Sequence, residues 1–365
     1  MSFENKFNLK TNPFRMTPAT KSEEIIWAGF EKIKERISNR IKRSIRLPNS
    51  SLVLNWGEYG SGKTHSARYF SKESILNELK GVNTRPYPIV ISLPKGKEPV
   101  KSLFISIIDK LNIEELRDKI NLEDITLFID NYGDNIHIQS VLKAIFNKDV
   151  DIPLLKMYLY GNISNPDLKQ LNQYNILRKF NSDNDYTLFL SGLFSSITNE
   201  KTFYSLVTLW IDEFEDIAVL NSSNIDKTNN FLRELLDNTP NNLLLFINLT
   251  QSALIGAEDL GEFLYESVKS RIKERNNFEL PDETDFRTYL KEIINYYKIS
   301  SNENEYHPFS KEVVDELISL TQGFTLRRFN EAFSILLELA DIEDASTPIT
   351  HDFLMQNLGD IIWEV

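Results

Sequence analysis

The sequence lacks cysteine altogether, because none of its 365 residues is Cys. A disulfide framework, thiol catalysis and cysteine-bound zinc are therefore excluded, and the composition fits a reducing compartment. Long apolar runs are missing as well. The first residues, MSFENKFNLK, have no signal-peptide core, and runs such as LLLFI are far too short to span a membrane. We therefore expect a cytoplasmic protein with no membrane partner.

Positive charge is also in deficit, since 53 acidic residues outnumber 41 basic ones and the net charge is −12. This balance opposes nucleic-acid binding by charge alone. Residues 31–46, EKIKERISNRIKRSIR, are a local exception, with seven basic and two acidic residues and isoleucine at every fourth position. The pattern predicts a helix with an apolar stripe. It is either a solvated helix packed on the core or a surface that follows a DNA or RNA backbone.

Glycine is scarce, with 13 in the whole chain, yet three fall within residues 57–62 of the segment GEYGSGKT. This segment follows the short apolar run SLVLNW and precedes the helical pattern KTHSARYFSKESILNEL. Strand, glycine-rich loop and helix form the context that the G-x-x-x-x-G-K-[ST] motif requires. In this motif, converging backbone N–H groups and the helix N-terminus hold phosphate oxygens. The sequence therefore predicts a nucleotide site.

The motif gives separate tasks to its side chains. Lys63 is expected to reach the β- and γ-phosphates and Thr64 to be a ligand of Mg²⁺, so ATP and Mg²⁺ are the expected cofactors. The expected nucleotide-binding residues of the loop are Gly57, Glu58, Tyr59, Gly60, Ser61, Gly62, Lys63, Thr64 and His65.

A second apolar strand, in LVTLWIDEFEDI (206–217), ends in Asp212 and Glu213. We expect Asp212 to hold Mg²⁺ through water and Glu213 to polarise the attacking water as a general base. The alternative is an acidic helix start after a strand. The next strand, in NNLLLFINLTQS (241–252), places Asn248 and Thr250 on one side. Either can contact the γ-phosphate or the attacking water, or can cap the following turn.

Two arginine-bearing segments follow these strands. YESVKSRIKER contains Arg271 and Arg275 at helical spacing, and LTQGFTLRRF places Arg327 and Arg328 at the start of a helix. Arginine suits a γ-phosphate because its planar fork is always charged. For each arginine taken alone, the alternative is a surface salt bridge.

Over residues 12–340 the chain resembles the AAA+ ATPases, and among them the replication-origin initiators and transposition regulators. NPF (12–14) is similar to a motif near the adenine pocket, GEYGSGKT to Walker A, WIDE to Walker B and INLT to sensor 1. VKSRIKER resembles the arginine-finger segment, which implies that Arg271 acts on ATP bound by a neighbouring subunit. GFTLRRF resembles the sensor 2 helix, which implies that Arg327 or Arg328 reaches the nucleotide of its own chain. The resemblance implies a homo-oligomer, either a ring or a filament.

The chain departs from this pattern between Thr64 and Asp212. A crossover between parallel strands needs only about a dozen residues, so after the strand PIVISL (88–93) most of residues 94–200 is expected to form a helical insertion. Within it, IPLLKMYLYGNISNPDLKQLN, followed later by TLWIDEFEDI, resembles ATP-binding proteins of BREX-type phage-defence systems. Only 25 residues follow LLELA (336–340), too few for a winged-helix domain, so we do not expect this chain alone to read DNA sequence.

The expected fold is α/β, a three-layer parallel-sheet P-loop ATPase core over residues 1–280, including the insertion, with an α-helical lid over 281–365. The expected function is ATP hydrolysis that gates a DNA-associated partner effector, of the nuclease, helicase or transposase class, in phage defence or mobile-element control. One alternative is a nucleotide-gated recruitment platform that uses hydrolysis as a timer. Another is a protein remodeller that threads its substrate past Tyr158 and Tyr160 of the segment YLYG.

Overall fold

The computed structural model describes residues 2–17, 19, 21–47, 49–80, 84–251 and 260–362. The chain forms two compact units. The sheet unit contains Ile37–Trp56 and Phe70–Asn276. The helical unit contains Met1–Arg36, Gly57–Tyr69 and Asn277–Val365.

A five-stranded sheet with the order β2-β3-β4-β1-β5 forms the centre of the sheet unit. The β2–β3 and β3–β4 pairs are parallel, with Ser92 opposite Asp212 and Ile211 opposite Ile247. The predicted α/β class is thereby confirmed. The strands are β1 Ser51–Gly57, β2 Tyr87–Ser92, β3 Val207–Asp212, β4 Leu243–Thr250 and β5 Ile272–Phe278.

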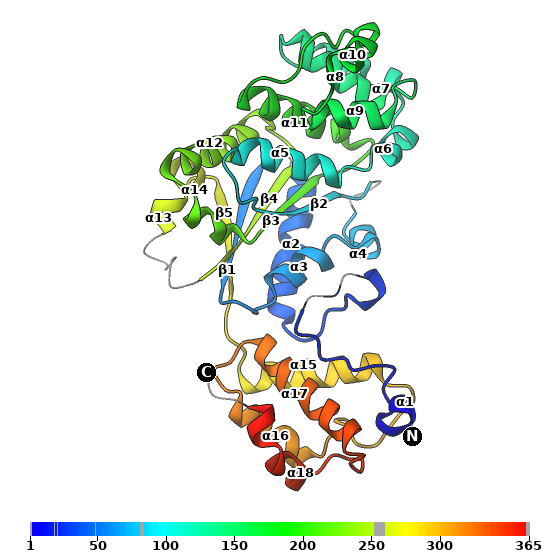
Figure 1. The fold of residues 1–365 in the computed structure, drawn as a ribbon, viewed down its shortest axis with the longest axis vertical. Coiled ribbons are helices and arrows are strands. Elements are labelled where there is room, and N and C mark those ends of the chain that lie inside the picture. Colours follow the sequence, from blue (N-terminus) through cyan, green and yellow to red (C-terminus); the bar gives the residue numbers. More distant parts are fainter. Residues whose placement is uncertain are drawn as a thin grey trace. The chain divides into compact units, whose positions relative to one another are not determined.

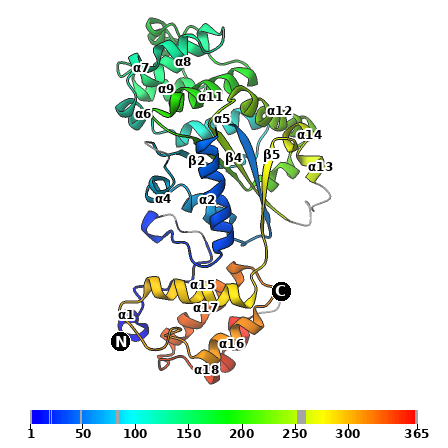
Figure 2. The same ribbon diagram turned by 180° about the vertical axis from the view of Figure 1, so that it is seen from behind.

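The three central strands β1, β3 and β4 are buried along their whole length. Strands of this kind need cover on both faces. In Figure 1, α5 (Pro99–Lys110) and α12 (Ser222–Asn238) cover one face, and in Figure 2, α2 (Glu31–Arg46) lies over the other. On this second face, Trp210 stacks on Phe246 with ring centroids 3.7 Å apart and on Phe70 at 6.4 Å. The predicted three-layer arrangement is therefore confirmed.

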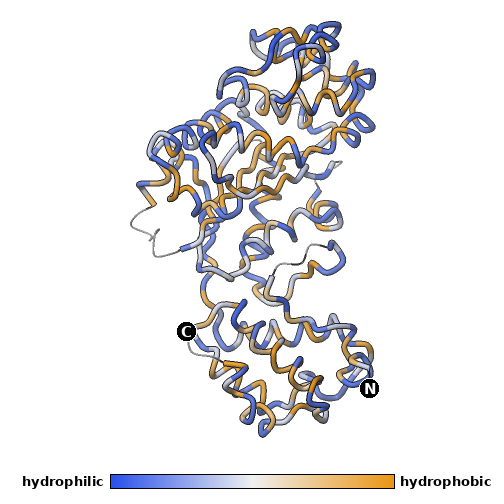
Figure 3. The backbone as a smooth tube through the Cα atoms, viewed as in Figure 1, coloured by the Kyte–Doolittle hydropathy of each residue, from blue (hydrophilic) through white to orange (hydrophobic). Residues whose placement is uncertain are grey.

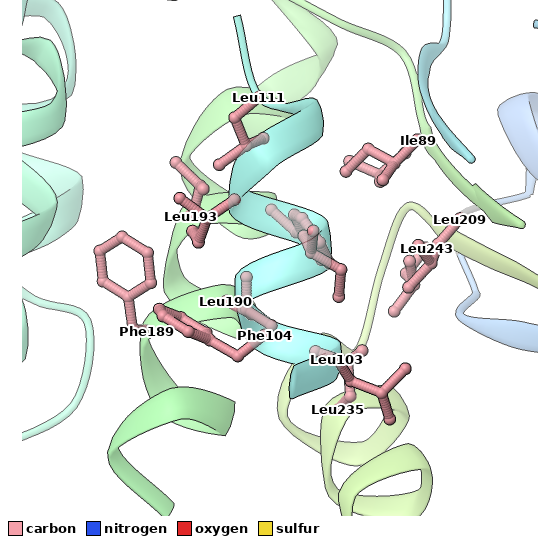
Figure 4. Close-up of a cluster of buried hydrophobic side chains, with 14 of the residues drawn as sticks. Ile89, Leu103, Phe104, Leu111, Phe189, Leu190, Leu193, Leu209, Leu235 and Leu243 are labelled. Atoms are coloured by element: carbon pink, nitrogen blue, oxygen red, sulfur yellow. The ribbon is translucent and has the colours of Figure 1, made fainter. Parts of the chain in front are cut away.

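The segment between β2 and β3 is helical, as expected for the insertion. Figure 4 shows how it is attached: Leu103 and Phe104 of α5 lie between strand residues such as Leu209 and the side chains of α11, including Leu193. The insertion therefore shares the hydrophobic core of the sheet. After α5 it contains α6 Ile113–Lys119, α7 Leu122–Asp130, α8 Ile136–Phe146, α9 Ile152–Leu159, α10 Asn165–Gln170 and α11 Asp183–Ile197.

Short elements complete the sheet unit. They are the α-helices α4 Glu73–Glu78, α13 Leu260–Phe263 and α14 Glu266–Lys269, and the 3₁₀ helices Leu171–Tyr174, Asn199–Lys201 and Phe214–Val219. Hydrophobic residues, orange in Figure 3, run along the strands of the sheet. Within the described ranges, no helix combines the length and apolar character that crossing a bilayer requires.

The helical unit has its own core, in which the N-terminal segment packs against the C-terminal helices. Phe14 lies 5.2 Å from Phe333 between ring centroids, and the Lys6 Nζ donates to Ala340 O at 2.8 Å. The NPF motif thus contributes its phenylalanine to this core. The helices are α1 Phe3–Phe7, α3 Lys63–Tyr69, α15 Glu283–Tyr297, α16 Lys311–Leu320, α17 Leu326–Ile342, α18 His351–Gln356 and α19 Leu358–Ile361, with a 3₁₀ helix at Ser22–Glu24. The division into a core at 1–280 and a lid at 281–365 remains a prediction.

Candidate active site

The glycine-rich loop connects the end of β1 to the first residue of α3. Gly60 and Gly62 have φ of +82° and +98°, backbone conformations that other residues rarely adopt. At Gly60, a Cβ atom would also lie 2.8 Å from the Arg327 Cβ and 3.0 Å from the Thr325 Oγ1. The loop can therefore turn sharply and approach the start of α17 only because glycine stands at these positions.

The Lys63 side chain lies inside this loop and is bound by its oxygen atoms. Its side chain is almost completely buried, and Nζ donates to Gly57 O at 2.9 Å, Glu58 O at 2.8 Å and Ser61 Oγ at 3.2 Å. A buried ammonium needs such partners, because burial without them is costly. The loop thus encloses a cation that a phosphate group can attract. Thr64, also predicted to act here, follows in the first turn of α3 and is half-buried.

The two candidate arginines of α17 have different contacts. The Arg327 guanidinium lies over the ring of Tyr59, 4.2 Å from its centroid, so this arginine stands beside the loop. Arg328 instead forms a 2.8 Å ion pair with Glu331, one turn along the same helix. Tyr59 is largely exposed, so its ring and the Arg327 fork form an accessible edge of the loop.

His65 faces the N-terminal segment. Its Nε2 lies 2.6 Å from Ile26 O, and its ring is 6.1 Å from that of Trp27, which in turn packs edge-on against Tyr69. Arg68 also donates to Ala19 O at 3.0 Å. The N-terminal segment therefore packs along α3, the helix that begins with Lys63. His65 therefore holds α3 against the N-terminal segment. Its place in the motif alone did not indicate this role.

The carboxylates at the end of β3 differ in their surroundings. Asp212 is buried and accepts a 2.9 Å hydrogen bond at Oδ1 from Asn248 Nδ2. Among the residues that the structure describes, none donates to its Oδ2. Glu213 is exposed and has φ +54°, ψ +38°, a left-handed conformation that is uncommon for glutamate. Such strain is typical of functional positions, where surrounding structure enforces it.

Asn248 and Thr250, the two sensor candidates, have different partners. The side chain of Asn248 lies at the buried carboxylate, as described above. The backbone N–H of Thr250 donates to Glu215 Oε2 at 3.0 Å. Glu215 belongs to an acidic turn in which Asp216 accepts a hydrogen bond from Lys95, and this bond raises the pKa of Lys95. Asn248 therefore contacts Asp212, whereas Thr250 contacts the acidic turn that follows Asp212.

Arg271, the candidate arginine finger, is paired within its own chain. Its Nη2 lies 2.6 and 2.7 Å from the two carboxylate oxygens of Asp237, and its Nε lies 2.8 Å from Oδ1. Asp237 is near the C-terminal end of α12. Arg275, on β5, lies 5.1 Å from the centroid of the Trp56 ring. The arginine side chains of this segment therefore bind other parts of the sheet unit in the present structure.

The loop and the end of β3 each carry groups of the kinds that bind a magnesium nucleotide. The loop supplies a cation, glycine-shaped backbone and a hydroxyl at Thr64, and Asp212 offers a carboxylate oxygen that no described residue occupies. Within the described part of the chain, no three His, Asp or Glu residues cluster closely enough to hold a metal by themselves. Mg²⁺ is commonly bound by one or two carboxylates together with phosphate oxygens and waters. The loop residues belong to the helical unit and Asp212 to the sheet unit.

Comparison with solved structures finds proteins of the same architecture. The Drosophila origin recognition complex bound to DNA matches with a TM-score of 0.57 and 13% identity, over 100% of this chain and 68% of that one. The Aeropyrum pernix ORC1 protein in complex with DNA matches with a TM-score of 0.52 and 13% identity, over 99% and 71%. The Aeropyrum pernix ORC2 protein, in ADPNP–ADP complexes, has a TM-score of 0.51 and 12% identity, over 92% and 68%.

The chain has the AAA+ ATPase fold. At these identities the similarity shows the fold alone. No family model matches the sequence, and no curated protein matches it. The AAA+ fold agrees with the order of motifs along the chain, in which the glycine-rich loop precedes the acidic strand end and the two arginine segments follow.

Four residues that contact these candidates, directly or through a neighbour, were not identified from the sequence. Two are Glu215 and Asp237, and the others are Asn55, which donates to Asn248 Oδ1 at 2.7 Å, and Asn276, which donates to Asn55 Oδ1 at 2.9 Å. A signal existed for Asn55, because a polar residue inside the apolar run SLVLNW needs a buried partner. Asn276 lies in the polar stretch KERNNF, where nothing distinguishes it from its neighbours. Glu215 and Asp237 are acidic residues in segments already rich in acids, and only the fold reveals their partners.

Proposed function

We propose that this chain binds and hydrolyses ATP with Mg²⁺, and that ATP controls both its self-assembly and its association with a DNA-bound partner protein. The observation that carries the proposal is the glycine-rich loop, which encloses the Lys63 ammonium and lies beside Arg327. A cation held in such a loop at a helix N-terminus is a typical binding site for the phosphates of a nucleotide.

Each residue then has a defined task. Lys63 and the loop N–H groups bind the β- and γ-phosphates, and Arg327 contacts the γ-phosphate of its own chain. Thr64 and Asp212 are the ligands that the chain offers to Mg²⁺, which neutralises phosphate charge when bound. Glu213 orients and deprotonates the attacking water. Asn248, hydrogen-bonded to Asp212, is the preferred sensor and Thr250 the alternative.

Assembly completes the site in this proposal. Arg271 would release Asp237 and reach the γ-phosphate bound by the next subunit of a ring or filament. An arginine supplied in this way stabilises the charge of the phosphoryl-transfer transition state. ATP would then both join neighbouring subunits and time their separation, because hydrolysis removes the phosphate that Arg271 contacts.

The proposed partners are DNA and an effector of the nuclease, helicase or transposase class. Two of the structures with the same fold are complexes with DNA, which supports a role at DNA for this chain. The exposed basic residues Lys42, Arg43 and Arg46 of α2 offer a surface of suitable charge. The similarity of residues 152–172 to BREX-type proteins favours phage defence or mobile-element control as the setting.

A recruitment platform remains the second candidate, because the helical insertion exposes several large apolar side chains, including Leu127, Ile136 and Leu177. Such side chains are common at protein–protein contacts. A threading remodeller is disfavoured. Tyr158 is 1% exposed, and its hydroxyl is hydrogen-bonded to Arg178 O at 3.1 Å, so it has no surface to grip a polypeptide.

Two variants test the ATPase. Lys63→Ala should abolish measurable ATP binding in calorimetry, whereas Lys110→Ala on the exposed end of α5 should leave it unchanged. Glu213→Gln should bind ATP normally but hydrolyse it at least about 10²-fold more slowly, because the general base is lost. Glu123→Gln, on the exposed surface of α7, is its matched control. Unchanged binding in the first variant, or near-normal turnover in the second, would overturn the proposal.

DNA-stimulated turnover distinguishes the first candidate from the platform. If DNA, added to the wild-type protein with ATP, raises the hydrolysis rate, the DNA-associated ATPase is supported. ATP-dependent rings or filaments whose slow turnover does not respond to DNA would instead support the platform.

A further inference from the structure

Four buried side chains form one continuous row of hydrogen bonds across the sheet. Asn276 Nδ2 donates to Asn55 Oδ1 at 2.9 Å, Asn55 Nδ2 donates to Asn248 Oδ1 at 2.7 Å, and Asn248 Nδ2 donates to Asp212 Oδ1 at 2.9 Å. The three asparagines are 0% exposed and Asp212 is 7% exposed. The row thus connects β5, β1, β4 and β3 in their spatial order, and we call it the amide row.

The carboxylate at one end fixes the direction of every bond in the amide row. An ionised carboxylate only accepts hydrogen bonds, so Asn248 must present its NH₂ group to Asp212. The Asn248 carbonyl then faces Asn55 and accepts its NH₂ group, and Asn55 in turn accepts from Asn276. No amide in the row can rotate by 180° without creating two opposed carbonyls or two opposed NH₂ groups.

The amide row is costly unless it has a use. Asparagine is disfavoured in strands, and a buried amide must find partners to offset its desolvation. The Asn276 Oδ1 has no hydrogen-bond partner among the residues that the structure describes, so the row carries one unsatisfied acceptor at its far end. An apolar residue at position 276 would avoid that cost.

We infer that Asn55 and Asn276 are positioning residues of the ATPase site, acting through Asn248. Asp212 determines which end of the Asn248 amide faces it, and Asn55, itself held by Asn276, keeps that NH₂ group beside Asp212 through the hydrogen bond to the Asn248 carbonyl. A donor in this place is suited to a phosphate oxygen or to the lone pair of the attacking water, whereas a carbonyl would repel both. The inference rests on the proposed role of Asp212 and Asn248 in ATP hydrolysis.

The amide row also joins β5 to the site. Asn276 is linked to Asn248 and Asp212 by way of Asn55, and it ends the row on the strand that begins directly after Arg271. A change at Asn276 can therefore reach Asn248 and Asp212 along the row without altering either residue. This separation makes Asn276 the most informative position to change.

The test measures kcat, KM for ATP and thermal stability for Asn55→Val and Asn276→Leu. Thr208→Val is the matched control, because Thr208 is a buried polar residue of β3 whose hydroxyl has no partner in the described structure. We expect kcat to fall about tenfold in Asn55→Val and less in Asn276→Leu, since one oriented hydrogen bond near a charged group is removed. KM should change less than about twofold, and Thr208→Val should retain normal kcat.

A merely structural row gives a different result. In that case Asn55→Val and Asn276→Leu lower the melting temperature while kcat per folded molecule stays normal in both, which would overturn the inference. The decisive comparison repeats Asn55→Val and Asn276→Leu in an Asn248→Ala background. If the two residues act through Asn248, they should have no further effect on kcat there, because coupled sites are not additive.

A measurement without nucleotide keeps the inference separate from activity. In protein labelled with ¹⁵N at asparagine, Asn276→Leu should shift the side-chain NH₂ resonances of Asn248, two hydrogen bonds away along the row, and Thr208→Val should not. Absence of that shift would overturn the row as a connection. Failure of the wild-type protein to hydrolyse ATP would instead overturn the proposed ATPase, and would be evident before any variant is made.

Discussion

Arg271 and Asp237 form a bidentate ion pair within one chain, with Nη2 at 2.6 and 2.7 Å from the two carboxylate oxygens. The Arg271 guanidinium also contacts Ser267 O, so its donors are directed at its own subunit. A guanidinium engaged in this way cannot offer the same fork to a phosphate. If Arg271 acts on a neighbour, Asp237 competes with that neighbour for it.

Asp237→Ala should therefore raise turnover at protein concentrations too low for full assembly. The increase should be at most about fivefold, because a partly exposed ion pair is worth only about 0–1 kcal/mol. Arg271→Ala should remove most turnover, since an arginine at a phosphoryl-transfer site contributes roughly 10³–10⁵ in rate. Steady-state ATPase assays over a range of protein concentrations measure both effects, and Asp124→Ala on α7 serves as the control. A fall in turnover in Asp237→Ala equal to that in Arg271→Ala would show that the pair supports Arg271 rather than restraining it.

The positions of Arg327 and Arg328 lead to a second prediction. Arg327→Ala should weaken ATP binding about tenfold or more, because a charged hydrogen bond to the γ-phosphate is removed. ADP, which lacks that phosphate, should be affected much less. Arg328→Ala should change neither affinity, since Arg328 pairs with Glu331 on its own helix. Calorimetric titrations of each variant in the Glu213→Gln background measure affinity without hydrolysis. Equal effects of the two substitutions would contradict this assignment.

The fold could be predicted from sequence because its signals are local. SLVLNW before a glycine-rich loop and LVTLWID before Glu213 mark buried strands and their ends without reference to the rest of the chain. The helical insertion could be inferred from length alone, as the spacing between the motifs exceeds what a crossover requires. These expectations of fold class are confirmed by the strand order and by the helices between β2 and β3.

The amide row could not be predicted, because it depends on register. Asn55 meets Asn248 and Asn276 only if β1 is aligned correctly with both neighbouring strands, and a shift by one residue would turn its side chain to the other face. Likewise, no local pattern indicates that Phe14 packs against Phe333, since the two lie near opposite ends of the chain. Interactions of this kind follow from the whole fold and not from any segment.

The basic face of α2 gives a third prediction. Reversing Lys42 and Arg46 to Glu should weaken DNA binding and lower the salt dependence of affinity by roughly one unit of slope for each phosphate that the protein no longer neutralises. Arg40 is left unchanged in this experiment, because it donates to Ser51 and burial lowers its pKa. It therefore supports the packing of α2 on β1.

Charge reversal on the insertion controls for net charge. Lys110→Glu with Lys148→Glu changes the total by the same amount at two exposed positions away from α2. Fluorescence anisotropy of a labelled duplex, titrated at several salt concentrations with ATP present, gives affinity and slope together. Equal weakening in both double variants would mean that only net charge matters. No binding by the wild-type protein even at low salt would remove DNA from its direct partners.

The last prediction concerns action between subunits, and it uses two inactive proteins. Arg271→Ala retains its own loop and Glu213 but offers no arginine to a neighbour. Glu213→Gln offers an intact Arg271 but lacks the base in its own site. When the two are mixed, some interfaces place the intact Glu213 of one subunit against the intact Arg271 of the next, so part of the turnover should return.

A mixture of Glu213→Gln with Lys63→Ala is the matched negative control, because each of these subunits has a defect in its own site and no arrangement repairs it. Recovery in the first mixture alone, measured as phosphate release at constant total protein, would establish that Arg271 works on ATP held by another subunit. Inactivity of both mixtures, together with wild-type turnover per subunit that does not depend on protein concentration, would mean that Arg271 serves its own chain through Asp237 and that the ATPase does not require assembly.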